Sequence, residues 1–529
     1  MIRGRFDLRI VFLCAVIIFL VSTSCKTQKK AVIVPTNIKQ HIQETKWADT
    51  LYTAGNYRSL KEAYKTYKKL LVVPFEQEET AEKLLKTALV LSLRVKELGV
   101  IDSSFLLQAE ELIAAYPHLV KYQSYLKFIS CIPYKVKGIG GGFLDITPNL
   151  NEYYDWIKEN IKPLNEELKA NAEITEFFAY MYICFYAEFS YFIDEEYDNL
   201  TSFFDLFPES TMIKYRLALY LDKDKDLFET ILEEEPKFQE VHLFLGESAY
   251  ERMKLLTAEK HFRKAYDIIP QSLSLLVYLA GIHFALEEYD ECIGFYEEAL
   301  RLAPEYKEAI LGKGICLGYM GKHEYAILVI NKLIEMGRHY LGEAHFWLAW
   351  NQNEMDQIKD AEENIKKTEN YLVGDVGVLA LRGVISFKLG KLVEAEAYLK
   401  QALILQNNHC ESIYYLAKID VLREDWEKSG NNFEKAAFCY RGLEAGLDAR
   451  IKEIEKSPMS LERKAKMILR KKAQLRNTAL IKATCFYNGA AGYFNCGLAD
   501  KALVFAAYAA QDKAFAAKAE ELIKKIENK

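Results

Sequence analysis

The sequence has few helix-breaking residues and few of the motifs that carry chemistry. Only 11 prolines and 26 glycines occur in 529 residues, so no long disordered tract is expected. A formal net charge of −6 excludes the strongly basic composition typical of nucleic-acid-binding proteins. The nine histidines are scattered, and the motifs His-Glu-x-x-His, Cys-x-x-Cys and Gly-x-Ser-x-Gly are absent. The sequence therefore predicts no catalytic residue, no metal site and no cofactor, and it favours a helical protein that is not an enzyme.

A pattern does recur about every 34 residues between positions 239 and 440. Each copy has one small residue in a first segment, at Gly246, Ala280, Gly314, Ala349, Gly383 and Ala417. A second segment carries a small, a large and a small residue, as in Ala258, Phe262 and Ala265. Because residues three or four apart share one face of a helix, the small side chains allow close packing of neighbouring helices. The pattern predicts six pairs of amphipathic helices.

This period and this small-large-small spacing resemble those of tetratricopeptide repeat (TPR) proteins, matched here in six successive units. The resemblance implies an all-α fold, a right-handed α-α superhelix built as a solenoid of stacked antiparallel helix pairs. Such a solenoid needs no single core, since each repeat packs only against its neighbours. The family uses its concave groove mainly to hold other proteins, so the resemblance implies a protein or peptide partner without identifying it.

The resemblance also indicates which residues would line the groove, because its wall is formed by the first helix of each pair. The matching positions are Leu243, Glu247, Tyr250, Val277, Phe284, Leu311, Ile315, Tyr319, Phe346, Trp350, Phe387 and Tyr414. Acidic residues lie beside them, at Glu240, Glu251, Glu308, Glu343 and Glu354, and the basic neighbours are chiefly Lys388 and Lys418. Aromatic side chains are common anchors of interfaces. We expect a partner segment with apolar anchors and some positive charge, bound as a helix or an extended peptide. The alternative is that half of these residues stack between repeats.

The first 24 residues predict a signal peptide. A basic start precedes an apolar run at 10–21, which is shorter than the roughly 20 residues that a membrane span needs. Small residues and Cys25 follow, which resembles a bacterial lipobox with a lipidated cysteine, although Ser22 replaces the usual aliphatic residue. Polar residues 25–43 are then expected to be a tether. This predicts a lipid-anchored envelope protein, on the outer membrane facing the periplasm. The alternatives are an ordinary cleaved signal and an uncleaved anchor.

Three segments flank or interrupt the regular repeats. Residues 44–236 predict divergent TPR-like helices, including a buried aromatic helix near 177–192. A glycine-rich loop at 135–148 lacks the flanking residues of a phosphate-binding loop, and is interpreted as an excursion between helices that could contact a partner. Residues 441–529 predict a long helix, a last TPR-like unit and a capping helix. Seven basic residues between 463 and 476 either surround that long helix or bind anionic lipid or an acidic partner.

The sequence leaves open whether the cysteines form disulfides. Of ten cysteines, eight follow Cys25, and this even count permits disulfides. Cys292 occupies a small-residue position of the repeat and Cys184 lies in the aromatic helix, so mostly free, packed thiols are expected.

The favoured function is a scaffold or adaptor in an envelope complex. The alternative resembles the TPR-built lipoprotein subunits that accompany solute-binding proteins of transporters, contacting a small ligand or the solute-binding protein.

Overall fold

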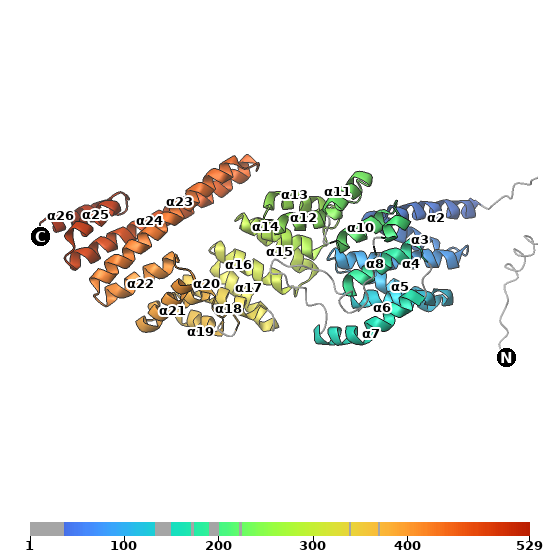
Figure 1. Ribbon diagram of the computed structural model, residues 1–529, viewed down its shortest axis with the longest axis horizontal. Helices are drawn as coiled ribbons and strands as arrows, with labels where there is room; N and C mark the ends of the chain where they lie inside the picture. Colours follow the sequence, from blue (N-terminus) through green and yellow to red (C-terminus); the bar gives the residue numbers. More distant parts are fainter. Residues whose placement is uncertain are drawn as a thin grey trace, which may run out of the picture.

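The computed structural model describes residues 36–132, 150–170, 174–189, 200, 202–221, 225–337, 340–368 and 371–528. They form an all-α, TPR-like solenoid of stacked antiparallel helix pairs (Figure 1), which confirms the predicted fold class. None of the helices in these ranges combines the length and apolar character that crossing a bilayer requires. The predicted signal peptide, Cys25 and the glycine-rich loop at 135–148 lie outside the described residues.

The first half of the solenoid is irregular. Its helices are α2 (Thr36–Ala54), α3 (Tyr57–Leu70), α4 (Gln77–Glu97), α5 (Ser104–Ala115), η1 (Pro117–Tyr122), α6 (Gln123–Cys131), α7 (Leu150–Ala170), α8 (Glu176–Phe189), α9 (Ser202–Leu206), α10 (Thr211–Tyr220) and α11 (Lys225–Glu234). Helix α2 begins inside the segment 25–43 that was expected to be a tether. Helix α8 is buried along almost its whole length, as the crowded aromatic residues predicted.

The second half contains the six regular pairs that the 34-residue pattern predicted. They are α12 (Val241–Glu251) with α13 (Leu255–Tyr266), α14 (Leu273–Ala285) with α15 (Tyr289–Leu302), α16 (Lys307–Tyr319) with α17 (His323–Met336), α18 (Leu341–Glu354) with α19 (Ile358–Lys367), α20 (Val376–Lys388) with α21 (Leu392–Leu405), and α22 (Cys410–Leu422) with α23 (Trp426–Lys456). The small residues serve close approach, because a Cβ atom on Gly246 would lie 2.5 Å from the Phe262 ring. We call these six pairs the repeat arc.

The turn inside each pair uses the same backbone conformation. One residue in each turn has a positive φ, between 56° and 75°, at Met253, Glu287, Gly321, Asp356, Gly390 and Glu424. These positions follow one another at the period of the sequence pattern. Four of the six are not glycine, although side chains disfavour the left-handed region. The repeated turn shows that the six pairs share one local geometry.

The end of the chain forms a long helical hairpin. Helix α23 has 31 residues, and after a turn at 457–460 helix α24 (Leu461–Asn495) returns antiparallel to it with 35 residues. Pro458 interrupts the helix, and the Ser460 hydroxyl caps α24 by accepting a hydrogen bond from the Arg463 backbone N–H at 3.3 Å. The sequence predicted one long helix here, and the structure shows two. Residues 441–482 are called the hairpin below, and α25 (Ala499–Ala510) and α26 (Ala516–Glu527) follow it.

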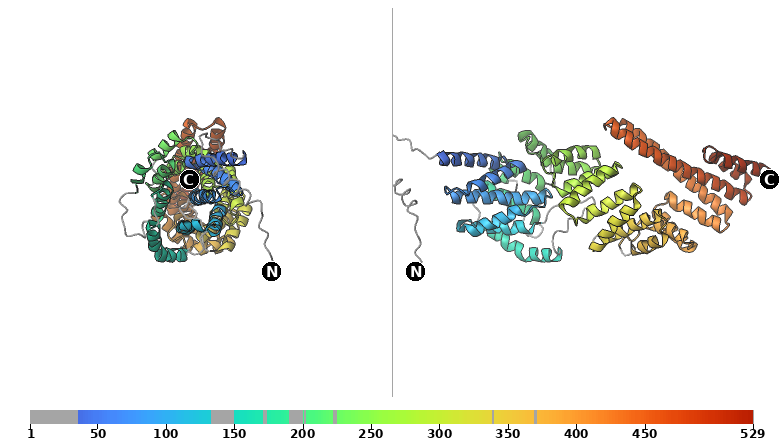
Figure 2. Two further views of the ribbon diagram at one scale, coloured as in Figure 1. Left: turned by 90° about the vertical axis from the view of Figure 1, so that its right-hand side faces the viewer. Right: turned by 180° about the vertical axis from the view of Figure 1, so that it is seen from behind.

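The hairpin crosses from the last repeats back to the first ones. Figures 1 and 2 show its tip lying beside α13 and α14, while its base continues into the pair formed by α24 and α25. An ion pair between Lys482 and Glu444 joins its two helices. The hairpin therefore starts at the last pair of the repeat arc and contacts the first pairs with its tip.

Candidate functional site

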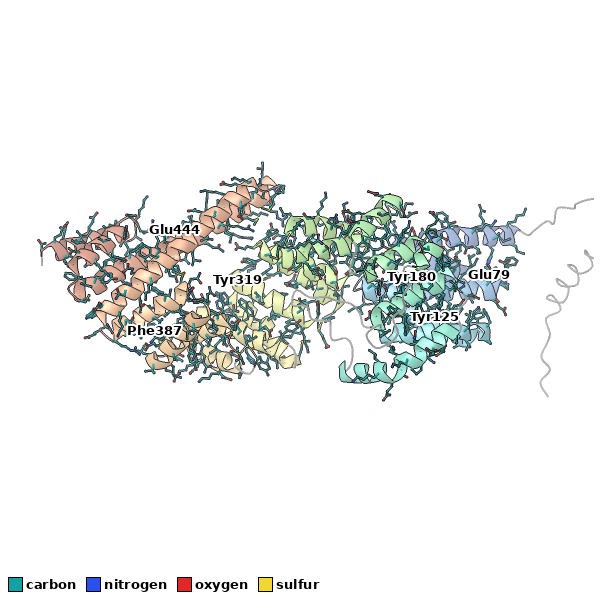
Figure 3. The ribbon with its side chains drawn as sticks, in the orientation of Figure 1. Glu79, Tyr125, Tyr180, Tyr319, Phe387 and Glu444 are labelled. Carbon is teal, nitrogen blue, oxygen red and sulfur yellow. A yellow bond between two sulfur atoms is a disulfide. The ribbon has the colours of Figure 1, made fainter. Side chains whose placement is uncertain are left out.

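Six aromatic side chains form a continuous cluster on the repeat arc, the central aromatic cluster: Phe284, Tyr289, Tyr319, Phe346, Trp347 and Trp350. The ring centroid of Tyr319 lies 5.6 Å from those of Phe284 and Tyr289. On its other side, the Tyr319 ring lies 5.6 Å from Trp347 and 5.7 Å from Trp350. Tyr319 remains 48% exposed, and Figure 3 places it on the side of the arc that faces the hairpin. The cluster combines a fixed arrangement of rings with an accessible surface.

Local sequence explains how the cluster assembles. Trp347 and Trp350 lie three residues apart on α18, so both side chains share one face of that helix. Tyr319 is the last residue of α16 and Tyr289 the first residue of α15. Trp347 and Tyr289 were not among the predicted groove residues. The three-residue spacing from Trp350 was a usable signal for Trp347, whereas the position of Tyr289 depends on the packing between repeats.

A second cluster combines aromatic rings with a lysine near the end of the repeat arc. The ammonium group of Lys418 lies 4.8 Å from the ring centroid of Phe387, 5.5 Å from that of Tyr414 and 4.9 Å from that of Tyr415. Burial, together with the nearby charge of Lys388, lowers the pKa of Lys418. Phe387 and Tyr414 were predicted for the groove, and Tyr415 was missed. The Lys418 ammonium group therefore already lies over these three rings, where a cation from a partner would otherwise bind.

Four of the twelve predicted groove residues are buried, which corrects the prediction for Leu243, Glu247, Val277 and Leu311. The three aliphatic side chains belong to the hydrophobic cores between helices, because the stacking of successive pairs covers that side of the first helix. The remaining eight keep accessible surface, namely Tyr250, Phe284, Ile315, Tyr319, Phe346, Trp350, Phe387 and Tyr414. Their role in binding stays a prediction.

One of the acidic residues expected beside the groove is also buried. The Glu240 carboxylate lies 3.6 Å from the Arg94 guanidinium and accepts a hydrogen bond from the Tyr57 backbone N–H at 2.5 Å. Both charged side chains are fully buried. Glu240 therefore joins the irregular half of the solenoid to the first regular pair and is no part of a partner surface.

The hairpin is held against the repeat arc by buried and half-buried ion pairs. Arg463 donates two hydrogen bonds to the Glu288 carboxylate, each at 2.6 Å, and one to Glu259 at 2.5 Å. Lys471 pairs with Glu287. The bidentate fork of an arginine fits a carboxylate especially well. Part of the basic run between 463 and 476 therefore finds its acidic partner inside the same chain.

The environment of Glu288 keeps its carboxylate ionised. Burial alone would raise the pKa of Glu288, but hydrogen bonds from His283 and Arg463 outweigh burial and lower the pKa to about 2. The Nδ1 atom of His283 lies 2.7 Å from Glu288, so His283 is a packed histidine. Apolar contacts add to the docking, since Met467 is buried and Ile468 packs against the same core. The contacts of Arg463, Lys471, Met467 and Ile468 with the repeat arc are together called the hairpin latch.

The hairpin latch borders the central aromatic cluster. The Arg470 guanidinium lies 5.7 Å from the ring centroid of Tyr289 and donates a hydrogen bond to the backbone carbonyl of Glu287. Tyr289 in turn stacks on Tyr319 with an interplanar angle of 10°. A segment bound to the exposed side of Tyr319 would therefore lie close to the hairpin.

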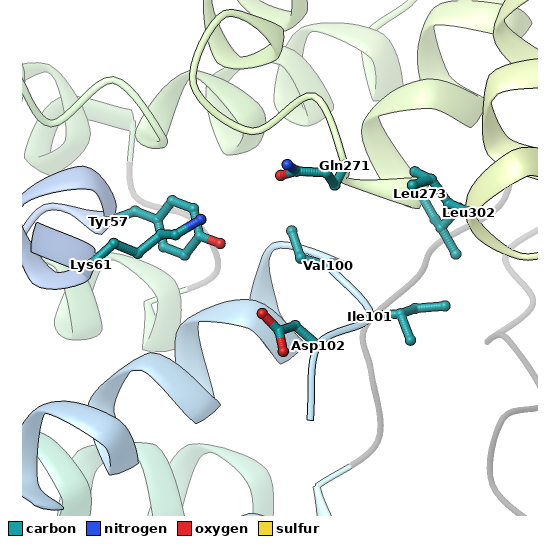
Figure 4. Close-up of a pocket in the computed structure, with 8 residues that line it drawn as sticks. All are labelled: Tyr57, Lys61, Val100, Ile101, Asp102, Gln271, Leu273 and Leu302. Atoms are coloured by element: carbon teal, nitrogen blue, oxygen red, sulfur yellow. The ribbon is translucent and has the colours of Figure 1, made fainter. Parts of the chain in front are cut away.

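A separate pocket lies where the irregular half meets the regular repeats (Figure 4). Its lining comes from α3, the turn after α4, the start of α14 and the end of α15, with Lys61 and Asp102 as its charged residues. Apolar residues, among them Val100 and Leu273, line the same pocket. Among the described residues, no group of three or more His, Cys, Asp or Glu side chains is arranged to hold a metal ion.

The cysteines follow the expectation with one exception. Cys410 and Cys439 form a disulfide between α22 and α23, which the sequence did not predict. In this structure no disulfide joins the other six cysteines in the described ranges: Cys131, Cys184, Cys292, Cys316, Cys485 and Cys496. The pairing of Cys410 with Cys439 depends on how a first helix packs on its second helix, 29 residues further along the chain.

Comparison with known proteins shows what this chain is similar to. No family model matches it. Over 206 residues it is 27% identical to tetratricopeptide repeat protein 8 of Caenorhabditis elegans, covering 38% of this chain and 40% of that protein. Over 85 residues it is 33% identical to Hsp70-Hsp90 organizing protein 2 of Arabidopsis thaliana, covering 15% of each. The chain thus spans less than half the length of either relative.

Solved structures resemble parts of the chain. A tetratricopeptide repeat protein from Parabacteroides merdae has a TM-score of 0.36 and 16% identity, covering 51% of this chain and 99% of that one. The pilF protein of Pseudomonas aeruginosa has a TM-score of 0.35 and 17% identity, covering 39% and 92%. The six helix pairs, together with the similarity to a tetratricopeptide repeat protein, show that this chain has a TPR-like fold.

Proposed function

We propose that this protein is a lipid-anchored scaffold that binds a protein or peptide segment on the central aromatic cluster. One observation carries the proposal, the continuous contact of six aromatic rings around the half-exposed Tyr319. Tyrosine and tryptophan bury much area at a small entropic cost and are the usual anchors of interfaces. A ring cluster whose members already pack together is preorganised for such a contact.

The charges near the cluster favour a partner segment with some positive charge. Glu354 is exposed at the end of α18, and Glu343 is half-exposed at its start. Glu287, at the other end of the cluster, is already paired with Lys471 of the hairpin. Opposite charges at the rim of an interface steer association and set orientation more than they add affinity. The segment would therefore place apolar side chains on the rings and basic side chains toward α18.

The membrane anchor rests on the sequence before residue 26. The signal-like start and Cys25 support lipidation, which would place the scaffold in the bacterial envelope, on the outer membrane facing the periplasm. Because a single acyl chain binds membranes only weakly, stable anchoring requires more than one chain or an added contact. A tether between lipid and helices would let the repeat arc reach partners in an envelope complex.

Substitution of Tyr319 by alanine tests the binding surface. Peptides selected from a random library on the full chain are expected to bind Y319A about tenfold more weakly or worse, because a central aromatic anchor is lost. Isothermal titration calorimetry measures the effect, with circular dichroism confirming the helical content. The matched control is Y325A, which removes an exposed tyrosine from α17 and should leave affinity unchanged. Equal affinity of Y319A and wild type would reject the central aromatic cluster as the site.

Native mass spectrometry that finds a retained small molecule, with no peptide selected, would support the transporter-subunit alternative instead.

Substitution of Cys25 by alanine tests the anchor independently. In a bacterial host fed an alkyne fatty acid, wild-type protein is expected to become labelled and to sediment with membranes. The C25A variant is expected to lose the label, because the thiol that would carry the lipid is gone. Labelling that persists in C25A, or wild-type protein without label, would contradict the lipid anchor while leaving the peptide surface intact.

A further inference from the structure

Two buried cysteines face each other across the boundary between consecutive helix pairs. Cys292 lies on α15, the second helix of one pair, and Cys316 lies on α16, the first helix of the next. Their sulfur atoms are 2.7 Å apart, and both side chains are buried. This separation is well inside the distance at which two non-bonded sulfur atoms rest. Either the two thiols move apart or they become bonded.

We propose that Cys292 and Cys316 form a disulfide that joins two consecutive pairs of the repeat arc. The surroundings favour bonding over separation, because the cluster that holds both residues is closely packed with Tyr296, Ala280 and Ala309. Well-packed interiors resist the shift that would separate the sulfurs. The bond differs in kind from that between Cys410 and Cys439, which links the two helices of one pair.

The chemistry requires an organic disulfide as oxidant. One cysteine thiolate attacks a sulfur of the oxidant, which releases one thiol and leaves a mixed disulfide on the protein. The second cysteine thiolate then displaces the remaining thiol. In total, two protein thiols and one organic disulfide become one protein disulfide and two small thiols. The adjoining Cys316 thiol, together with burial, raises the pKa of the Cys292 thiol, so attack is slow once α15 and α16 have packed. The bond is therefore expected to form during folding.

The bond would join α15, whose N-terminal end carries the hairpin latch, to α16, which ends at Tyr319 of the central aromatic cluster. Glu288 precedes the first residue of α15, and Tyr319 is the last residue of α16. Covalent linkage of these two helices would hold the docking point of the hairpin and the centre of the aromatic cluster in one geometry. Export to an oxidising compartment, which the sequence predicts, is where such a bond persists.

Peptide mapping of the full chain tests the bond. The chain is reduced, unfolded, refolded with mixed oxidised and reduced glutathione, alkylated and digested with trypsin. Mass spectrometry is expected to find the peptides 265–301 and 314–322 linked in most molecules, since each contains one cysteine. The internal control is the linkage of peptides 401–418 and 436–441, which carry Cys410 and Cys439. Control peptides that are linked while Cys292 and Cys316 are both alkylated would overturn the proposal.

The variant C292A tests the structural consequence. Alanine occupies the equivalent position in other repeats, as at Ala258 and Ala326, where it is fully buried, so this variant is expected to fold. Reduction of the refolded wild type should accelerate hydrogen exchange in α15 and α16 severalfold and leave C292A unchanged. If reduction changed hydrogen exchange in α15 and α16 equally in the wild type and in C292A, this bond would not hold the two pairs together. Neither result depends on which partner the scaffold binds.

Discussion

Replacing Arg463 with alanine is expected to release the hairpin from the repeat arc. The substitution leaves the buried carboxylates of Glu259 and Glu288 without their shared guanidinium. Removing one partner of a buried ion pair costs about 3–5 kcal/mol. We expect the lower end, because Arg263 still pairs with Glu259 and His283 still contacts Glu288.

Distances between spin labels measure this release directly. Labels carried by unnatural amino acids at Leu461 and Met253, which are 85% and 74% exposed, would report the separation of the hairpin tip from the first repeat. A narrow distance distribution is expected for the wild type and a broader, longer one for R463A. The matched control R476A removes an exposed arginine from the same helix and should keep the narrow distribution. An R463A distribution identical to that of the wild type would show that the remaining contacts, including the Lys471–Glu287 ion pair and the packing of Met467, hold the hairpin without Arg463.

Loss of Arg94 is expected to be the most damaging single change in the irregular half. Its guanidinium lies 3.6 Å from the ring centroid of Tyr215 and donates hydrogen bonds to the Tyr180 hydroxyl at 3.1 Å and the Gly55 carbonyl at 3.2 Å. These contacts connect α4, α8 and α10 with the Glu240 carboxylate at the start of α12. The variant R94A leaves Glu240 buried without a counter-charge, at an expected cost of about 3–5 kcal/mol.

A compensating variant separates the charge from the packing. R94M/E240Q keeps a long side chain at 94 and an acceptor for the Tyr57 N–H, and it removes both charges. Because replacing both members of a buried pair is often nearly neutral, this variant is expected to recover much of the loss. Urea unfolding followed by circular dichroism and hydrogen exchange in α4 measures the effect. R58A, which removes an exposed arginine from α3, is the control, with an expected change within about 0.5 kcal/mol. An R94M/E240Q variant as unstable as R94A would show that the guanidinium contacts, and not the unpaired carboxylate, dominate.

The sequence alone was sufficient to predict the helix pairs of the repeat arc, because the residues that determine each pair lie within one repeat. Gly246 and Phe262 belong to two helices joined by a short turn, and their packing recurs every 34 residues or so. The aromatic residues of α8 were likewise assigned to a buried helix by their density alone. Eight of the twelve predicted groove residues keep accessible surface for a similar reason, since they occupy one repeated position on a known kind of helix pair.

Features that join distant parts of the chain were decided only by the tertiary structure. The period of the repeat does not say how tightly one pair stacks on the next, so Leu243, Val277 and Leu311 were predicted to be exposed and are buried. Nor does it show that Glu240 meets Arg94, or that two cysteines of neighbouring pairs face each other. The basic run of α24 had the right charge for an acidic partner, but only the turn at Pro458 and the curvature of the repeat arc place Arg463 on Glu259 and Glu288.

The sequence by itself determined the class of this protein: an all-α solenoid of TPR type with aromatic residues on the first helices of its repeats. The tertiary structure decided which of those residues remain accessible and placed a hairpin beside them. The physical reason is the range of the interactions. Helix pairing and small-large packing act within one repeat, whereas the hairpin latch depends on ion pairs between residues about 175 to 204 positions apart, which no local pattern encodes.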